Sequence, residues 1–292
     1  MSKTGKILVS GASGFIGSNL VPKLCFHNYQ VVAITRSKDI SKFFQHENLK
    51  WISSDDMIIS EDILKSCDTL IHLASAGVDQ EEDCNLVELF KVNVINSYQL
   101  ILNCLNQGFK RIIYIGSCFE FGYMANIKGK PLSVYDALMP KDQYSATKAA
   151  LTSLLYPLTK YFKSEIRIIR AFNIYGPNQK ENRLYPTLMQ SIKYKKEVSI
   201  TKGSQKRYFT HVSFLVDSII RILKKKPKES YFSLENLGGG KLLSVIEFTK
   251  TLFKQNHLNF KQFLKFDKKS REGEASILSP NLNERFEISN KH

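Results

Sequence analysis

The glycine-rich turn near the start of the chain constrains the fold more than any other sequence feature. Gly11, Gly14 and Gly17 recur at three-residue spacing, directly after an apolar run at residues 6–10 and directly before an amphipathic stretch at residues 18–27. In a strand–turn–helix unit, glycine permits a tight turn and lets backbone N–H groups at the helix N-terminus approach a pyrophosphate. The order of the three parts favours a dinucleotide-binding turn over an ordinary strand-to-helix connection.

Similar apolar runs recur along the following part of the chain. They lie at residues 30–35, 51–53, 69–74, 111–117 and 165–170, with helical spacing between most of them. Uninterrupted apolar runs are typical of parallel strands that helices cover on both faces. The pattern predicts an α/β fold, a Rossmann-type doubly wound parallel sheet, over residues 1–172.

The pattern is less regular after residue 172. We expect helices near residues 183–194, 212–225 and 244–256, and a strand near residues 197–201. Residues 173–292 are therefore interpreted as a smaller, irregular and mainly substrate-binding portion, from which some segments return to the Rossmann domain.

Composition narrows the class of protein. A chain of 292 residues with 43% apolar residues can build a sizeable core, which argues against disorder. No apolar stretch approaches the roughly 18 residues of a membrane span, and the N-terminus has no signal-peptide pattern. We therefore expect a cytoplasmic protein without a membrane partner. Neither a disulfide framework nor a metal site is expected, because no CxxC pair occurs among the five cysteines: Cys25, Cys67, Cys84, Cys104 and Cys118.

The net charge of +15 has two interpretations. One is a nucleic-acid binder, which would lose affinity steeply as salt is added. The other is a set of solvated lysine faces with a general attraction for phosphorylated small molecules. Most of the 42 basic residues are scattered lysines, whereas nucleic-acid surfaces rely more on arginine and interleaved aromatic residues. The second interpretation is favoured, so no nucleic-acid partner is expected.

The residue after the second apolar run bears on cofactor choice. An NAD site usually has an acidic residue there that binds the ribose 2′-hydroxyl, but this chain has Arg36. A guanidinium suits a 2′-phosphate, so we predict that NADP(H) is preferred and that NAD(H) is the second choice. The alternative is an ordinary surface arginine at a strand end.

A tyrosine and a lysine suggest a reaction centre. Tyr144 and Lys148 lie four residues apart in the helix expected at residues 142–162, and therefore share one face. A nearby ammonium favours phenolate, so it should lower the tyrosine pKa from about 10. Such a phenol can exchange a proton with a carbonyl/alcohol pair. Ser117, at the end of an expected strand, could polarise the same oxygen, although a lone YxxxK pattern also occurs on solvated helix faces.

Together these motifs resemble the extended short-chain dehydrogenase/reductase family, in its nucleotide-sugar branch of NAD-dependent epimerases and dehydratases. The resemblance covers nearly the whole chain and includes residues 11–17, 72–75, 116–122, 170–177, 207–212 and 236–240. It implies that Ser117, Tyr144 and Lys148 are the catalytic trio and that Lys148 also holds the nicotinamide ribose.

The resemblance also implies binding residues. Asp56, rather than Asp55, would approach the adenine, and a nucleotide-diphosphate sugar would contact Ser117, Asn173, Arg207 and Arg271, since arginine binds a pyrophosphate bidentately. The implied cofactor-binding residues are Gly11, Ser13, Gly14, Phe15, Ile16, Gly17, Arg36, Asp56, Leu73, Ala74, Ser75, Asn93, Tyr144 and Lys148.

Members of this branch include 4,6-dehydratases, 4-epimerases and 4-ketoreductases, and the sequence separates these reactions in part. Similar dehydratases carry Asp-Glu directly after the hydroxyl residue, where this chain has Cys118 and Phe119, and Glu120 is expected to point elsewhere. The segments at residues 10–17 and 31–36 resemble the CDP-abequose synthase type of 4-ketoreductase. That resemblance implies NADPH-dependent reduction of the C4 carbonyl of a nucleotide-linked 4-keto-deoxyhexose, for deoxysugar precursors of surface polysaccharides such as lipopolysaccharide O-antigen.

Two other functions remain open. A UDP-hexose 4-epimerase would hold NAD tightly and show no net nicotinamide turnover. A non-catalytic, NADP-binding regulatory scaffold is disfavoured, because such proteins often lack the Tyr144/Lys148 pair. Relatives suggest a homodimer formed through the helices expected at residues 85–107 and 142–162.

Overall fold

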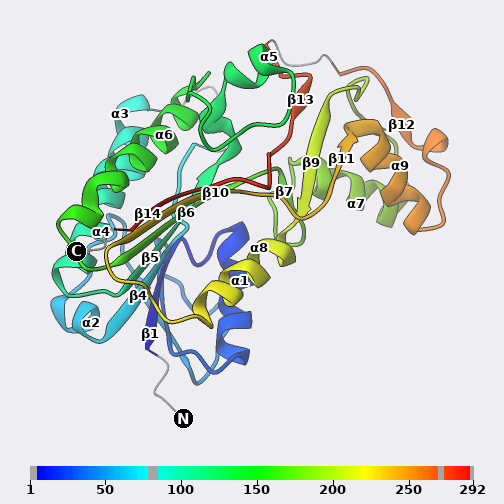
Figure 1. Ribbon diagram of the computed structural model, residues 1–292. Coiled ribbons are helices and arrows are strands. Elements are labelled where there is room, and N and C mark those ends of the chain that lie inside the picture. The colour runs from blue at the N-terminus through cyan, green and yellow to red at the C-terminus, as the bar shows by residue number, and fades with distance from the viewer. Residues whose placement is uncertain (1–4, 78–84, 269–272, 290–292) are drawn as a thin grey trace.

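The computed structural model describes residues 5–77, 85–268 and 273–289. Figure 1 shows a large sheet with helices on both faces and a smaller part beside it that carries β9, β11, α7 and α9. The predicted α/β class and Rossmann-type sheet are confirmed.

The large sheet has eight strands in the order β14-β10-β6-β5-β4-β1-β2-β3. Every neighbouring pair is parallel except β10 and β14. The order reverses between β1 and β4, and in sheets of this kind ligands bind at the carboxyl ends of the strands beside that reversal. The strands are β1 (Lys6–Ser10), β2 (Val31–Thr35), β3 (Leu49–Ser53), β4 (Cys67–His72), β5 (Arg111–Ser117), β6 (Glu165–Ala171), β10 (Tyr231–Leu237) and β14 (Arg285–Ser289).

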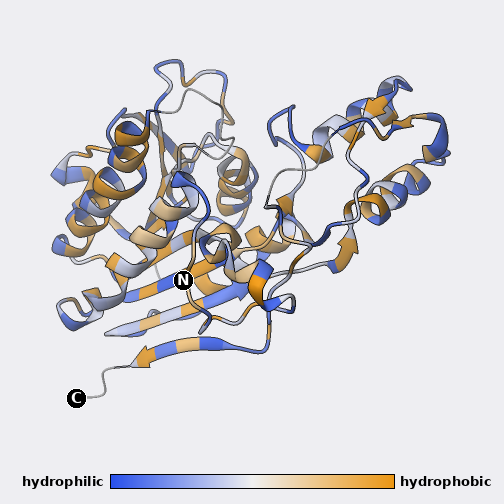
Figure 2. Cartoon of the chain, turned by 90° about the horizontal axis from the view of Figure 1, so that it is seen from above, coloured by the Kyte–Doolittle hydropathy of each residue, from blue (hydrophilic) through white to orange (hydrophobic). Residues whose placement is uncertain are grey.

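Helices cover the two faces and bury one core on each side. Ile7 and Val9 of β1 face α1 and α8, whereas Leu8 between them faces the core of α2, α4 and α6. Because both faces are buried, the strands read as continuous apolar runs. Figure 2 shows that the flanking helices carry both hydrophobic and hydrophilic residues. The helices are α1 (Phe15–Phe26), α2 (Glu61–Lys65), α4 (Ser97–Asn106), α6 (Gln143–Leu155) and α8 (Val212–Leu223).

The helix expected at residues 85–107 is interrupted. It consists of α3 (Leu86–Phe90), a π-helical turn η1 (Lys91–Asn96) and then α4. The wider turn contains Asn93, whose side chain is buried and bonded outside the helix. The segment expected at residues 142–162 likewise changes from α6 to a 3₁₀ turn, η3 (Tyr156–Lys160), whose second residue is proline.

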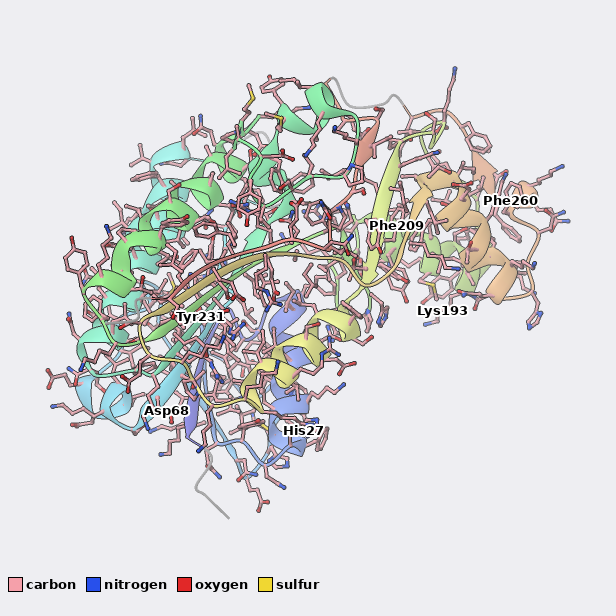
Figure 3. All side chains as sticks on the ribbon, in the orientation of Figure 1. His27, Asp68, Lys193, Phe209, Tyr231 and Phe260 are labelled. Atoms are coloured by element: carbon pink, nitrogen blue, oxygen red, sulfur yellow. The ribbon has the colours of Figure 1, made fainter. Side chains whose placement is uncertain are left out.

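The smaller part has its own core, in which the rings of Phe209 and Phe248 stack 3.9 Å apart. Phe209 is labelled in Figure 3, where it lies on β9 between the two parts of the molecule. The chain does not stay in this part, because α8, β10 and β14 return to the large sheet. Its elements are β7 (Ile174–Tyr175), α7 (Leu184–Tyr194), β8 (Val198–Ser199), β9 (Lys206–His211), β11 (Lys241–Ser244), α9 (Val245–Gln255), η4 (Phe260–Gln262), β12 (Leu264–Lys265) and β13 (Ile277–Leu278).

Two short helical segments lie between β5 and α6, and the second of them packs against β13 of the smaller part. They are η2 (Cys118–Phe121) and α5 (Met124–Lys128).

The cysteines and the helices bear on the disulfide and membrane expectations. Cys25, Cys67, Cys104 and Cys118 are buried free thiols, whereas Cys84 lies outside the described residues. Within the described ranges, no helix has the length and apolar character that crossing a membrane requires.

Candidate active site

The glycine turn lies against the end of β4. Gly11 has a positive φ of 67°, and a Cβ added to it would lie 2.6 Å from the backbone nitrogen of Ala74. A Cβ on Gly17 would lie 2.4 Å from the carbonyl oxygen of Gly11. Only glycine fits these positions without displacing backbone, so the turn brings the start of α1 directly to the strand-order reversal.

The first turn of α1 is open to an anion. It begins at Phe15 after Gly14, and among the described residues no side chain caps it. The first turn also contains no acidic residue. Its backbone N–H groups and the positive end of the helix dipole therefore suit a phosphate. Phe15 and Ile16 are half-buried beside it.

The end of β2 presents polar groups on the far side of the turn. Thr35 is buried, and its hydroxyl lies 2.8 Å from Ser13 Oγ and accepts the backbone N–H of Ser37. Arg36 is exposed and forms no ion pair with the described residues. Asp56 is also exposed, but Asn96 Nδ2 donates to its carboxylate at 3.1 Å. Arg36 is thus more available to a ligand than Asp56.

Asn93 fastens the loop that follows β4. Its Oδ1 accepts the N–H of Ala76 at 2.7 Å, and its Nδ2 donates to the Ala76 carbonyl and to Thr147 Oγ1. The loop holds Leu73, Ala74 and Ser75, which are half-buried. Within the described residues, the side-chain amide of Asn93 therefore bonds to the loop and to α6, and not toward a cofactor.

Ser117, Tyr144 and Lys148 meet in one buried region. Ser117 is the last residue of β5, while Tyr144 and Lys148 lie one turn apart on the buried face of α6. Asp142 caps α6, since its carboxylate accepts the N–H of Ser145 at 2.8 Å. Lys148 Nζ donates to the Ile115 carbonyl at 2.8 Å and lies 4.4 Å from the centre of the Tyr114 ring.

Protonation of this pair differs from the sequence-based expectation. Burial raises the pKa of Tyr144 to about 12, and the hydroxyls of Ser117 and Ser75 only partly oppose this rise. Burial lowers the pKa of Lys148 to about 8. The expected lowering of the tyrosine pKa is wrong for this structure, because burial disfavours the charged phenolate. The Lys148 ammonium does not offset this, since it contacts the Ile115 carbonyl and the Tyr114 ring. Tyr144 is therefore a neutral phenol at pH 7.

Ser75 lies close to the reaction centre. Its hydroxyl is near enough to Tyr144 to lower the pKa of that phenol, yet it forms no hydrogen bond of ordinary geometry with the described residues. A buried hydroxyl without a partner is uncommon, so a ligand is its natural partner. The sequence indicated Ser75 only as a residue beside the cofactor.

The positions after Ser117 do not offer free acids. Cys118 is buried, and burial raises the pKa of its thiol to about 11, while Phe119 is exposed. Glu120 turns inward and is fully buried. Ser117 and Glu120 have the spacing of a capping box, a pattern that is visible in the sequence and pairs these two residues.

The predicted substrate residues differ in whether their polar groups already have partners. Asn173 has a positive φ of 39°, and its buried Nδ2 has no hydrogen-bond partner among the described residues. Its backbone N–H faces the Cys118 thiol. Arg207 is buried, pairs with Glu274 at 2.6 Å and donates to the Ala275 carbonyl at 2.8 Å. Arg271 lies outside the described residues.

The sequence matches a known family over most of its length. The profile of the NAD dependent epimerase/dehydratase family aligns with residues 7–233. The chain belongs to this family. The expected resemblance is thereby confirmed, although the profile does not distinguish a 4-ketoreductase from other members.

Similar curated proteins are named for different reactions. A dTDP-D-glucose 4,6-dehydratase of Homo sapiens is 24% identical over 266 residues, which cover 85% of this chain and 73% of the relative. UDP-glucuronic acid decarboxylase 5 of Arabidopsis thaliana is 29% identical over 231 residues, which cover 75% of this chain and 66% of the relative.

Solved structures give the same fold. The UDP-N-acetylglucosamine 4-epimerase from Methanobrevibacter ruminantium M1 superimposes with a TM-score of 0.84 at 23% identity, over 96% of this chain and 90% of that chain. MoeE5, in complex with UDP-glucuronic acid and NAD, superimposes with a TM-score of 0.82 at 25% identity, again over 96% and 90%.

Proposed function

We propose that this family member is a reductase that converts the C4 carbonyl of a nucleotide-linked 4-keto-deoxyhexose to an alcohol. The observation that supports it best is the buried Tyr144, whose pKa is raised to about 12, beside Ser117 and Lys148. A phenol that stays protonated at neutral pH is suited to giving a proton to a carbonyl oxygen. In an epimerase or a dehydratase the same residue would first have to accept a proton from an alcohol.

The chain's own residues supply the proton and hold the oxygen. The reduced nicotinamide, when bound, supplies the hydride that adds to C4. As the carbon–oxygen double bond becomes single, its electron pair moves to oxygen, which takes the proton of the Tyr144 hydroxyl. Ser117 donates a hydrogen bond to the same oxygen, and the Lys148 ammonium stabilises the phenolate until water reprotonates it.

Arg36 supports NADPH as the preferred reductant. It is exposed at the end of β2, where a 2′-phosphate would lie if the dinucleotide follows the glycine turn. NAD(H) remains the second choice, and MoeE5 has been solved with NAD.

A nucleotide diphosphate suits the groups on the other side of the site. The unpartnered Nδ2 of Asn173 can donate to a phosphate oxygen, and Arg207 lies close enough to influence the Cys118 thiol beside Ser117. The Glu274 carboxylate occupies Arg207, so we expect diphosphate binding to compete with this ion pair. Arg271 is proposed as the second arginine of this subsite.

A 4-epimerase with tightly bound NAD is the second candidate. It is favoured by the superposition on the UDP-N-acetylglucosamine 4-epimerase, which covers nearly the whole chain. In that reaction the same residues would act in both directions, and the nicotinamide would end each cycle unchanged.

A homodimer is proposed from the exposed face of α3, η1 and α6. These segments pack together, and their outer surface carries five large apolar side chains that water would otherwise cover. Sedimentation of the purified protein would detect it, and a monomer at micromolar concentration would contradict it. The side chains are Leu86, Val87, Phe90, Ile95 and Leu154.

The absorbance at 340 nm tests the reductase directly. The purified protein is mixed with NADPH and with a panel of CDP- and dTDP-4-keto-deoxyhexoses. Loss of absorbance that requires one of the keto sugars supports the proposal and identifies the base. No loss with any sugar, together with NAD released on denaturation, would support the epimerase. No loss and no bound nucleotide would contradict both.

A further inference from the structure

A fully buried carboxylate lies directly behind the reaction centre. Glu120 follows Ser117 by three residues, in the 3₁₀ turn η2. Its Oε1 accepts the backbone N–H of Ser117 at 2.7 Å, and its Oε2 accepts Thr152 Oγ1 at 3.0 Å and Arg170 Nε at 2.8 Å. Each carboxylate oxygen thus has at least one donor.

These donors come from three different elements. Ser117 ends β5, Thr152 lies one turn beyond Lys148 on α6, and Arg170 lies near the end of β6. Glu120 therefore links the Ser117 backbone to the helix that carries Tyr144 and Lys148. The space for this link depends on a glycine, because a Cβ on Gly116 would lie 2.5 Å from Glu120 Oε1.

Two cations lie near the buried Glu120 carboxylate, Arg170 in direct contact and Lys148 on α6. Arg170 is buried beside it, with its guanidinium 4.9 Å from the centre of the Phe121 ring. The charge of Glu120 also acts on Lys148 and raises its pKa, while the other neighbours of that ammonium are neutral: the Ile115 carbonyl, the Tyr114 ring and the buried His72. A buried carboxylate persists only where such partners hold it.

We propose that Glu120 is a positioning residue of the reaction: it fixes Ser117 relative to the Tyr144–Lys148 helix and keeps a negative charge behind the lysine. This inference rests on the proposed function of that trio. Without Glu120, Ser117 would lose the bond that holds its backbone, and misplacement by about 1 Å can reduce turnover by about a hundredfold.

The first variant is Glu120→Gln, which keeps the shape and removes the charge. We expect kcat to fall ten- to a hundredfold, with the KM for the nucleotide sugar changing less than about threefold, because the diphosphate subsite is separate. Glu120 raises the pKa of both Lys148 and Tyr144, so removing its charge lowers both. Both groups are needed in protonated form for reduction, so the alkaline limb of the kcat/KM profile should move to lower pH.

The second variant, Glu120→Leu with Arg170→Met, separates positioning from stability. An apolar pair of similar size often replaces a buried ion pair without loss of stability. We expect this double variant to fold normally, to keep the low kcat, and to exchange the Ser117 amide hydrogen faster than the wild type, as measured by mass spectrometry.

Glu165 offers a matched control. It is also fully buried and pairs with Arg111 and Arg167, but it begins β6, at the opposite end of the strands from Ser117. Arg167 lies over the ring of Tyr231, which Figure 3 labels at that end of the sheet. Glu165→Gln should lower the melting temperature about as much as Glu120→Gln, yet leave kcat per folded molecule and the pH profile unchanged.

Two results would overturn the inference. One is wild-type kcat and an unmoved alkaline limb in Glu120→Gln after correction for the folded fraction. The other is full recovery of kcat in the double variant with unchanged amide exchange at Ser117, which would reduce Glu120 to a structural ion pair. If the wild type turns over no nucleotide sugar, the proposed function fails, and the exchange measurement alone then decides whether Glu120 holds Ser117.

Discussion

Tyr144 shows how burial sets the protonation state of a reactive side chain. Its phenol has lost most contact with water, and Ser117 and Ser75 restore only part of the stabilisation that phenolate would need. The four-residue spacing predicts that Tyr144 and Lys148 share one helix face, but it does not predict how deeply that face is buried. Desolvation depends on the elements packed over the helix, and a spacing of four residues does not contain that information.

Tyr144→Phe should reduce kcat by about a thousandfold, because it removes the proton donor while keeping the ring. Binding of NADPH, followed by fluorescence titration, should change little. Tyr161→Phe is the matched control, since Tyr161 directly follows η3 and is 76% exposed. Full turnover in Tyr144→Phe would refute the mechanism.

Lys148 should give the pH profile an alkaline limb. Its pKa is lowered to about 8, so the ammonium that stabilises the Tyr144 phenolate is lost as pH rises through that value. The kcat/KM for reduction should therefore be constant near pH 7 and fall above about pH 8. In Lys148→Arg the guanidinium keeps its charge, so the residual activity should show no decline near pH 8. A wild-type profile that rises between pH 7 and 9 would contradict this assignment.

His72 ties stability to pH in the acid range. It is buried, its Nδ1 lies 2.6 Å from Ser10 Oγ, and burial lowers its pKa to about 3. The unfolded chain binds a proton there near pH 6.5, whereas the folded chain does not, so stability is lost as pH falls from about 6.5 towards 3. The slope should be about 1.4 kcal/mol per pH unit at most. His72→Gln should lack this part of the acid dependence in urea titrations, and an identical slope in both proteins would exclude His72 as its source.

At the scale of elements, continuous apolar runs allowed the strands of the sheet centre to be predicted. The run at residues 111–117, for example, is β5, buried along its whole length. Two strands of the large sheet were missed because they do not look like buried runs. In β14 apolar and charged residues alternate from Arg285 to Ser289, since one side faces solvent. In β10, polar Ser233, Glu235 and Asn236 interrupt the run.

The π-helical turn η1 is the element that helical periodicity could not reveal. Six residues with helical spacing look the same whether their backbone bonds span four residues or five. Only the partners of Asn93 show why the wider turn forms, because its amide bonds to Ala76 and Thr147 outside the helix. Glu120 is a similar case, since its capping-box spacing was readable but its partners on α6 and β6 were not.

Asn93→Ala tests what this turn does. Three hydrogen bonds are lost, and the N–H and carbonyl of Ala76 are left without their partner, so unfolding free energy should drop by about 1–3 kcal/mol. The loop after β4 should also loosen, which would weaken dinucleotide binding. Asn106→Ala is the control, because Asn106 is exposed at the end of α4. Urea titration and NADPH fluorescence measure both effects, and equal results for the two variants would rule out the role of Asn93.

At the scale of the whole molecule, the two parts are interwoven rather than joined by a linker. The chain leaves the large sheet after β6, builds β9, returns with α8 and β10, and leaves again into β11 before β14 closes the sheet. A division at residue 172 therefore does not separate the two hydrophobic cores, because α8 lies after residue 172 but packs on the same core as α1.

This interweaving predicts one cooperative unfolding transition. Trp51, the single tryptophan, lies on β3 and reports on the large sheet, whereas circular dichroism reports on every helix. The two signals should follow the same curve in urea, because the smaller part cannot unfold without pulling on β10 and β14. A helical loss that precedes the Trp51 change would show that the smaller part unfolds independently.

The position of β14 has a consequence for how the protein is made. During synthesis β10 joins the sheet with its outer edge unpaired, and that edge stays open until residues 285–289 have left the ribosome. An open edge is a template on which another chain can add a strand. Chains cut short before β14 should therefore aggregate even though the nucleotide-binding half is intact. Once β14 is in place, the alternating charges of Arg285 and Glu287 make the finished edge a poor partner for a second molecule.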